Sequence, residues 1–241
     1  MNDFININVS GAGEPLIFFH GWGFNHTVWL SILPKITSKY KIYLIDLPGF
    51  GNTMLMAWDV FKPSLLNQLP AEFAVVGWSM GGLYAMRLAV EAPNRVGKLL
   101  LIASTPCFIQ HLHWPGIAAQ VVTDFMESVL INPYKTMVKF LAIQLIRKMP
   151  KQIKIVVESR EGLMQGLKIL LEWDLRSVLH QYTGPTCFLF GKLDRIIPLD
   201  IVAIMRVQYP LWDYKIFDQA AHIPFLSHQD DFIDVLDEMM A

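Results

Sequence analysis

The chain has little cysteine and little charge. Only two of its 241 residues are cysteines, Cys107 and Cys187, too few for a disulfide scaffold and without the spacing of metal ligands. We therefore expect two reduced cysteines in the protein interior, no metal site and no cofactor. Charged residues make up 17% of the chain and the net charge is −1, which excludes a globally basic nucleic-acid binder. We expect no nucleic-acid partner.

Long hydrophobic runs are also missing, although 53% of the residues are hydrophobic. The longest stretch without Lys, Arg, Asp or Glu covers residues 99–123, and Pro106 and Pro115 interrupt it. This pattern is typical of a buried strand followed by a loop, not of a membrane span. The first residues lack the basic start and apolar segment of a secretion signal. We therefore expect a cytoplasmic protein without a membrane contact, and a monomer.

Short apolar runs alternate with helical patterns along much of the chain. Runs of this length that are apolar throughout favour parallel strands buried on both faces. The sequence therefore predicts an α/β fold with a mostly parallel central sheet flanked by helices. The predicted strands are residues 16–19, 42–45, 74–76, 99–102, 187–190 and 214–217.

This strand rhythm disappears between residues 106 and 180, where helical segments replace it. The segments cover residues 121–130, 134–147 and 161–171. We interpret 106–180 as a helical cap inserted into the sheet-forming core, which then comprises 1–105 and 181–241. No flexible linker or low-complexity tract separates the parts, so we expect one compact unit.

The most informative motif is Gly77-Trp78-Ser79-Met80-Gly81, between a predicted strand and a helical pattern at residues 83–90. A serine on a sharp strand-to-helix turn needs small neighbours, because a Cβ atom there would strike the backbone. The two glycines meet this need. The motif predicts a nucleophile elbow with Ser79 as the nucleophile, but it also occurs by chance, so its surroundings must support it.

A serine hydroxyl is a weak nucleophile and needs a base, which a carboxylate orients. In the α/β-hydrolase fold the acid and then the histidine follow the serine in the chain, each after a strand. Asp194 follows the strand at 187–190, and His222 follows the strand at 214–217. We therefore predict Ser79, Asp194 and His222 as a catalytic triad.

Asp194 and His222 could each be structural instead. An aspartate in a turn commonly accepts hydrogen bonds from nearby backbone amides, and a lone histidine is commonly structural. Asp200, Asp213 and Asp218 compete for the role of the acid. Asp200 is better explained as the N-cap of a helix that begins near Ile201, and the other two flank the last strand. Asp194 therefore remains the prediction.

The loop His20-Gly21-Trp22-Gly23 follows the first predicted strand. In this fold such a loop supplies one backbone N–H to an oxyanion hole, and the residue after the nucleophile supplies the other. We therefore predict Trp22 and Met80 as the two donors. For His20 we expect a structural hydrogen bond that holds this loop.

Over nearly its whole length the chain resembles the pimeloyl-acyl-carrier-protein methyl ester carboxylesterases of biotin synthesis, which have the α/β-hydrolase fold. The segments at 106–108, 114–117 and 140–144 are the narrowest part of the likeness. The resemblance implies a serine carboxylesterase that hydrolyses the methyl ester of a pimeloyl chain on acyl carrier protein and releases methanol. The motifs that carry it are residues 20–23, 46–51, 77–82, 103–108, 114–117, 140–144 and 220–222.

The resemblance also implies which residues line the acyl site. They are Trp22, Ser79, Met80, Phe140, Leu141, Ala142, Ile143, Gln144 and His222.

The charge distribution independently favours an acidic partner. Residues 128–157 contain six of the 20 basic residues and no acidic residue, which leaves 14 basic against 21 acidic residues elsewhere. A basic cap on an acidic body would attract an acidic carrier protein. The alternative is that these basic residues form a solvated helix face without a binding partner. The predicted docking residues are Lys135, Lys139, Arg147, Lys148, Lys151 and Lys154, of which the first two share a helix face.

Two other functions remain open. A broad short-acyl carboxylesterase without a carrier partner would use the same triad. A ligand sensor of the hydrolase fold would have kept the cavity without turnover, and its Ser79 would not react with a fluorophosphonate.

Overall fold

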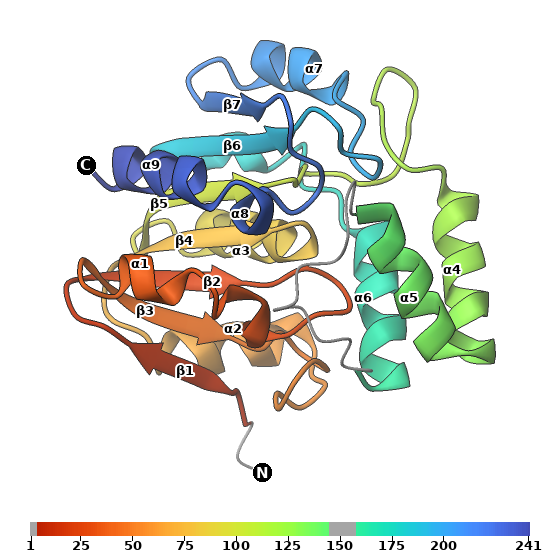
Figure 1. Ribbon diagram of the computed structural model, residues 1–241, viewed down its shortest axis with the longest axis horizontal. Helices are drawn as coiled ribbons and strands as arrows, with labels where there is room; N and C mark the ends of the chain where they lie inside the picture. Colours follow the sequence, from red (N-terminus) through yellow and green to blue (C-terminus); the bar gives the residue numbers. More distant parts are fainter. Residues whose placement is uncertain (1–3, 145–157) are drawn as a thin grey trace.

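The protein is built on one twisted sheet. A computed structural model describes residues 4–144 and 158–241, which contain seven strands in the order β1-β3-β2-β4-β5-β6-β7 (Figure 1). β1 pairs antiparallel with β3, and every other neighbouring pair is parallel. The strands are β1 (Ile7–Ser10), β2 (Glu14–Phe19), β3 (Tyr40–Ile45), β4 (Phe73–Trp78), β5 (Val96–Ile102), β6 (Thr186–Gly191) and β7 (Asp213–Phe217).

The six predicted runs form the six strands of the parallel part, which confirms that prediction. β1 is the strand that the apolar runs did not predict. Its four residues are only half-buried or exposed, because it lies at the edge of the sheet and pairs with β3 alone. An edge strand of this kind has no need of a fully apolar run.

Helices cover both faces of the sheet, as buried strands require. Successive residues of β4 alternate between two apolar clusters: Val75 faces α2 and α3, whereas Val76 faces α1 and α9. Figure 1 shows these helices on opposite sides of the strands. The helices are α1 (Leu33–Ile36), α2 (Trp58–Leu66), α3 (Met80–Glu91), α7 (Ile201–Gln208), α8 (Pro224–Ser227) and α9 (Gln229–Met240), with short 3-10 turns at His26–Trp29 and Leu179–Gln181.

Three further helices stand together beside the edge at which the parallel strands end (Figure 1). They are α4 (Ala119–Ile131), α5 (Pro133–Gln144) and α6 (Arg160–Glu172), and α4 packs against both others. We call these three helices the cap. They confirm the predicted helical segments, although the end predicted for α5 lies outside the described residues. None of the described helices is both long and apolar enough to span a membrane.

The start of α6 rests directly on the loop that follows β3. A Cβ atom on Gly162 would lie 1.9 Å from the carbonyl oxygen of Gly49, so the two backbones touch. The Ser159 hydroxyl caps α6 by accepting from the Gly162 N–H and donates to the same Gly49 oxygen. The buried Glu158 carboxylate accepts hydrogen bonds from Gly51 N–H and from Asn25. This joint fixes one end of the cap to the core.

One local expectation was wrong. α7 begins at Ile201 as predicted, but the Asp200 side chain makes no capping hydrogen bond, and its backbone is helical instead of extended. The reason is the turn before it: the N–H groups of Ile201 and Val202 already donate to the carbonyls of Pro198 and Leu199. The donors that a capping carboxylate serves are therefore partly occupied.

Candidate active site

Ser79 sits in a strained turn between β4 and α3. Its backbone has φ 54° and ψ −120°, a conformation that costs a residue with a side chain on the order of 1–3 kcal/mol. Backbone contacts hold the turn: the Ser79 N–H donates to Ile102 O at 2.9 Å, and the Ser79 carbonyl accepts from Gly82 N–H and Ser104 Oγ, each at 2.9 Å. The end of β5 thus fixes the position of the serine.

The glycines around Ser79 are needed for this turn. A Cβ atom would lie 2.7 Å from Gly81 O if placed on Gly77, and 2.4 Å from Phe19 O if placed on Gly81. On Gly82 it would lie 2.2 Å from the Ser104 hydroxyl. The contacts agree with the steric argument drawn from the motif.

Asp194 makes both kinds of contact that the sequence presented as alternatives. Its Oδ2 atom lies 2.7 Å from Nδ1 of His222. Its Oδ1 atom accepts from the backbone N–H groups of Ile196, at 2.7 Å, and Ile197, at 3.2 Å. Both side chains of the pair are buried. Because its own turn holds one oxygen, the carboxylate can orient the imidazole ring.

The other ring nitrogen of His222 is an acceptor without a partner among the described residues. Since the Asp194 carboxylate faces Nδ1, that nitrogen carries the hydrogen, and Nε2 keeps its lone pair. Nε2 is buried and has no hydrogen-bond partner among the described residues, and no hydrogen bond joins it to Ser79 Oγ in this structure. Hydrogen bonds between base and nucleophile commonly form only in the substrate complex. The indole N–H of Trp78, next to Ser79, donates to the His222 carbonyl at 2.9 Å and ties the two loops together.

The two predicted oxyanion donors are backbone N–H groups without a competing acceptor. Within the described part of the chain, neither the N–H of Trp22 nor that of Met80 donates to a backbone carbonyl or a side chain. Met80 is the first residue of α3, where the N–H groups point out of the helix. Both remain available to an anionic oxygen near Ser79.

The cap contacts the loop that carries Trp22. The indole N–H of Trp22 donates to Leu163 O on α6 at 2.8 Å, and its ring meets the edge of Phe140 on α5 at a centroid distance of 4.8 Å. Gly23 has φ 76°, and a Cβ atom there would lie 2.3 Å from the terminal methyl of Met137. Two cap helices therefore fix the loop that carries Trp22.

His20 has the structural role expected from the sequence. Its Nδ1–H donates to Gly21 O at 2.8 Å, and its Nε2 accepts from Leu47 N–H at 2.9 Å. Burial lowers the pKa of His20 to about 4, so the ring is neutral near pH 7. A neutral ring is required, because Nε2 must keep its lone pair to accept from Leu47.

An apolar cavity of about 140 Å³ lies next to Ser79, between the core and the cap. Of the residues predicted for the acyl site, Trp22, Ser79, Phe140 and Ile143 line it. Its other walls come mainly from the cap and from the loop after β5. These residues are Phe108, Ile117, Val121, Val122, Phe125, Leu167 and Leu170, and the loop after β6 adds Arg195 and Ile196.

The remaining acyl-site candidates on α5 lie elsewhere. Leu141 is buried against the core cluster that contains Phe24, Ala142 is exposed, and Gln144 is buried with no hydrogen-bond partner for its amide among the described residues. Helical periodicity is the reason, since five consecutive residues of a helix cannot all face one cavity. Their contact with substrate stays a prediction.

The predicted docking residues are visible only in part. Lys135 and Lys139 are exposed on α5, and Lys139 Nζ lies 5.7 Å from the centre of the Phe125 ring. The other four, Arg147, Lys148, Lys151 and Lys154, lie outside the described residues.

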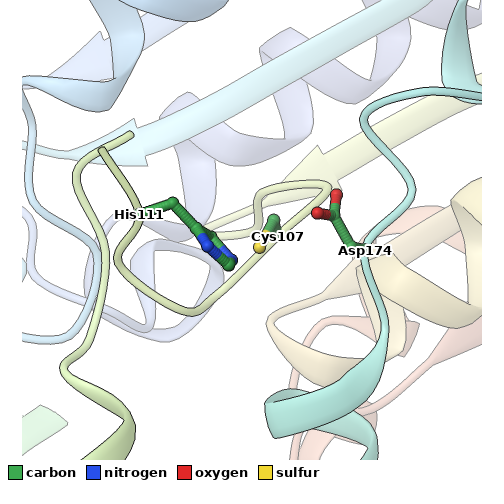
Figure 2. A group of neighbouring side chains, drawn as sticks. All are labelled: Cys107, His111 and Asp174. Atoms are coloured by element: carbon green, nitrogen blue, oxygen red, sulfur yellow. The ribbon is translucent and has the colours of Figure 1, made fainter. Parts of the chain in front are cut away.

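A second group of polar side chains lies where the loop after β5 meets the chain after α6. The ligand atoms of Cys107, His111 and Asp174 lie within 4.8 Å of one another, with the cysteine between the other two (Figure 2). Both Asp174 oxygens accept from the Arg176 guanidinium, and burial raises the pKa of the Cys107 thiol, which donates to Ile109 O. A metal needs a thiolate and a free carboxylate. The donor set is therefore occupied, and we assign this group to joining the chain before α4 to the chain after α6.

Both cysteines are free and buried, as the sequence predicted. The interpretation from sequence missed the roles of two other residues at the site, Ser104 and Arg195. Ser104 comes two residues after a predicted strand, and Arg195 directly follows the predicted acid. Polar side chains of a parallel sheet gather at these strand ends, so their position was the available signal.

Comparisons with known proteins agree with this geometry. The model of the "Alpha/beta hydrolase family" matches residues 16–235. The pimeloyl-[acyl-carrier protein] methyl ester esterase of Legionella pneumophila (strain Paris) is 49% identical over 237 residues, which cover 98% of this chain and 99% of the relative. The protein of that name from Proteus mirabilis (strain HI4320) is 37% identical, with coverages of 94% and 92%.

Solved structures share the fold. An esterase from Exiguobacterium antarcticum superposes with a TM-score of 0.90 at 23% identity, covering 97% of this chain and 94% of that one. A bromoperoxidase from Bacillus anthracis gives 0.85 at 19% identity, with coverages of 98% and 95%. The protein therefore belongs to the alpha/beta hydrolase family and, within it, to the pimeloyl-[acyl-carrier protein] methyl ester esterases.

Proposed function

We propose that this protein is a serine carboxylesterase that hydrolyses the methyl ester of a pimeloyl chain carried by acyl carrier protein, a reaction of biotin synthesis. We further propose that it acts in the cytoplasm as a monomer. The observation that carries the proposal is the Asp194–His222 pair, which Trp78 ties to the turn of the strained Ser79 at an apolar cavity. Relatives of nearly the same length that bear this esterase name support the substrate.

In the first half of the reaction, His222 Nε2 takes the proton of Ser79 while Oγ attacks the ester carbonyl carbon. The N–H groups of Trp22 and Met80 hold the resulting oxyanion. Asp194 accepts the hydrogen bond from Nδ1–H and stabilises the imidazolium. The bond from the carbonyl carbon to the methoxy oxygen then breaks, His222 gives this oxygen its proton, and methanol leaves.

In the second half, water attacks the acyl-enzyme with His222 again as the base. The bond to Ser79 breaks and a free carboxylate is released. The chain between the two carbonyl groups lies in the apolar cavity, where Phe140 and Ile143 form part of the wall. A dry cavity of about 150 Å³ is large enough for benzene, so a short acyl chain matches the size found here.

The cap is proposed to receive the carrier. We propose that the cap is part of an insertion that covers residues 106–180, since Cys107 pairs with Asp174 as a β-bridge near the two ends of that insertion. Lys135 and Lys139 are exposed on its surface, and the basic residues between 145 and 157 add to the charge. An acidic carrier would be attracted to this surface before it docks.

Mass spectrometry of methyl pimeloyl-carrier protein tests the proposal directly. Incubation with the enzyme should remove the methyl group, and Ser79→Ala should leave the substrate unchanged. Free short-chain methyl esters serve as matched substrates and should react more slowly. Equal rates on these esters would favour the broad carboxylesterase, and a Ser79 that no fluorophosphonate labels would favour the sensor.

A further inference from the structure

One charged side chain lines the cavity beside Ser79. Arg195 follows Asp194 in the loop after β6, and its neighbours along the wall are apolar, Ser79 excepted. Among the residues that the structure describes, it is the cavity's one charged lining residue. It is also exposed, so it lies where the cavity meets solvent.

Arg195 has no partner within residues 4–144 and 158–241. Its guanidinium takes part in neither a hydrogen bond nor an ion pair there, and the ionisable side chains between 145 and 157 are all basic. The nearest carboxylate in the chain, Asp194, is already occupied by His222 and by two backbone N–H groups. The charge of Arg195 is therefore available to a ligand.

The carrier-bound substrate offers this charge no anion in the cavity. Its acyl chain has a methyl ester at one end and a thioester at the other, and both are neutral. A cation beside an apolar wall gains most from an anionic partner, because the low local dielectric strengthens the pair. The planar guanidinium matches the geometry of a carboxylate, which it can bind through two parallel hydrogen bonds.

We propose that Arg195 binds the distal carboxylate of half-esters of dicarboxylic acids, and that the enzyme hydrolyses these small carrier-free molecules as a second class of substrate. The ester end would reach Ser79, the methylene chain would occupy the cavity, and the free carboxylate would meet Arg195. The backbone N–H groups of Ile196 and Ile197 hold the turn that carries the arginine. This inference rests on ester hydrolysis at Ser79, which it shares with the proposed function, and not on the carrier.

Water is the only co-reactant that this hydrolysis needs. Ser79 Oγ forms a bond to the ester carbonyl carbon, the bond to the alkoxy oxygen breaks, and the alcohol leaves with the proton that His222 took from the serine. Water then attacks the acyl-enzyme and the bond to Oγ breaks. The products are the alcohol and the dicarboxylate, and the carboxylate on Arg195 is unchanged throughout.

A pair of substrates isolates the role of the charge. The monomethyl and dimethyl esters of one diacid differ only in the distal group, so the ratio of their kcat/KM values reports on its recognition. Arg195→Met should lower this ratio roughly tenfold, in the range expected for a partly exposed charged hydrogen bond, with the dimethyl ester measured on the same variant as the internal reference. Arg195→Lys should keep part of the preference. Lys192→Met, which removes an exposed lysine paired with Asp218, is the matched control and should leave the ratio unchanged.

A change of ionic strength tests the role of the Arg195 charge without a substitution. The ratio for the unaltered enzyme should fall as ionic strength rises, and the half-esters should show an optimum chain length that the diesters lack. An unchanged ratio in Arg195→Met, or a ratio insensitive to salt, overturns the inference. If the enzyme hydrolyses the carrier-bound ester but does not prefer half-esters to diesters, this inference is rejected and the proposed function is not. If it prefers half-esters but does not hydrolyse the carrier-bound ester, the proposed function is rejected and this inference is not.

Discussion

The core and the cap differ in how deeply their helices are buried. Helix α3, which begins after Ser79, buries nine of its twelve residues, whereas α4 in the cap buries two of thirteen. The proposed triad lies on core loops held by backbone hydrogen bonds, and the cavity wall comes largely from the cap. In the proposed function, the chemistry therefore belongs to the core, and most of the contact with the acyl chain belongs to the cap. Substitutions in the core should change kcat, and those in the cap should change KM.

The strongest test of the core is Ser79→Ala. Removal of the nucleophile should lower kcat by about 10⁵- to 10⁶-fold, because the variant lacks the hydroxyl that is proposed to form the acyl-enzyme. Substrate binding should be largely intact, which equilibrium binding of the carrier-bound ester measures. Retained turnover would exclude Ser79 as the nucleophile.

Asp194→Asn is the next largest change. An amide in place of the carboxylate cannot hold the His222 tautomer that leaves Nε2 as the base, and kcat should fall by about 10⁴-fold. The matched control is Asp218→Asn, which lies just after β7 and pairs with an exposed lysine. If both variants lose activity equally, the aspartate next to His222 is not the orienting acid.

Protonation of His20 makes the stability of the core depend on pH. Burial lowers its pKa from 6.5 to about 4, so between these values the unfolded chain binds a proton that the folded protein does not. Above about pH 6.5 the ring is neutral in both states, so His20 does not affect the free energy of unfolding. This free energy should fall by about 3 kcal/mol as the pH drops to 4. Urea unfolding of the unaltered protein and of His20→Gln measures this loss, since the variant cannot titrate.

In His20→Gln the free energy of unfolding should lack this loss between pH 6.5 and pH 4. His180→Gln, an exposed position, provides the comparison and should keep the original pH dependence. Parallel curves for all three proteins would show that His20 does not control acid stability.

Phe140→Ala tests the cap. Loss of this ring from the cavity wall removes apolar contact worth roughly 1.5–3 kcal/mol, so KM for a pimeloyl ester should rise about 10- to 100-fold. The value of kcat should change far less, and an acetyl ester should be nearly unaffected. Tyr134→Ala, an exposed aromatic on the same helix, is the control. A dominant fall in kcat would contradict the division of roles between core and cap.

The smallest expected effect concerns the carrier. Charge reversal of Lys135 and Lys139 together should weaken carrier binding by several-fold at low salt, since each exposed pair contributes about 0.2–1 kcal/mol. The effect should disappear at high ionic strength. Lys35→Glu, on α1 in the core, should have no such effect. Binding that neither salt nor the double variant alters would rule out docking on α5.

The sequence predicts most of the core, because its strands are apolar throughout and its reactive residues follow strand ends in a known order. It predicts the cap less completely. Which residues of 140–144 face the cavity depends on how α5 packs, and Leu141 turns out to face the core. Ser104 matters through its hydrogen bond to Ser79, and Arg195 through a cavity that distant segments form together. The local sequence shows only that each follows the end of a strand. β1 escaped detection because an edge strand can remain partly polar.

The turn after Asp194 has an evolutionary consequence. Backbone N–H groups hold the Asp194 carboxylate, and within residues 4–144 and 158–241 the guanidinium of Arg195 makes no hydrogen bond to it. A position that the proposed chemistry needs therefore adjoins one that borders the cavity and takes no part in the proposed triad. Relatives could acquire a new preference among small esters by a single codon change there, without any loss of the inherited chemistry.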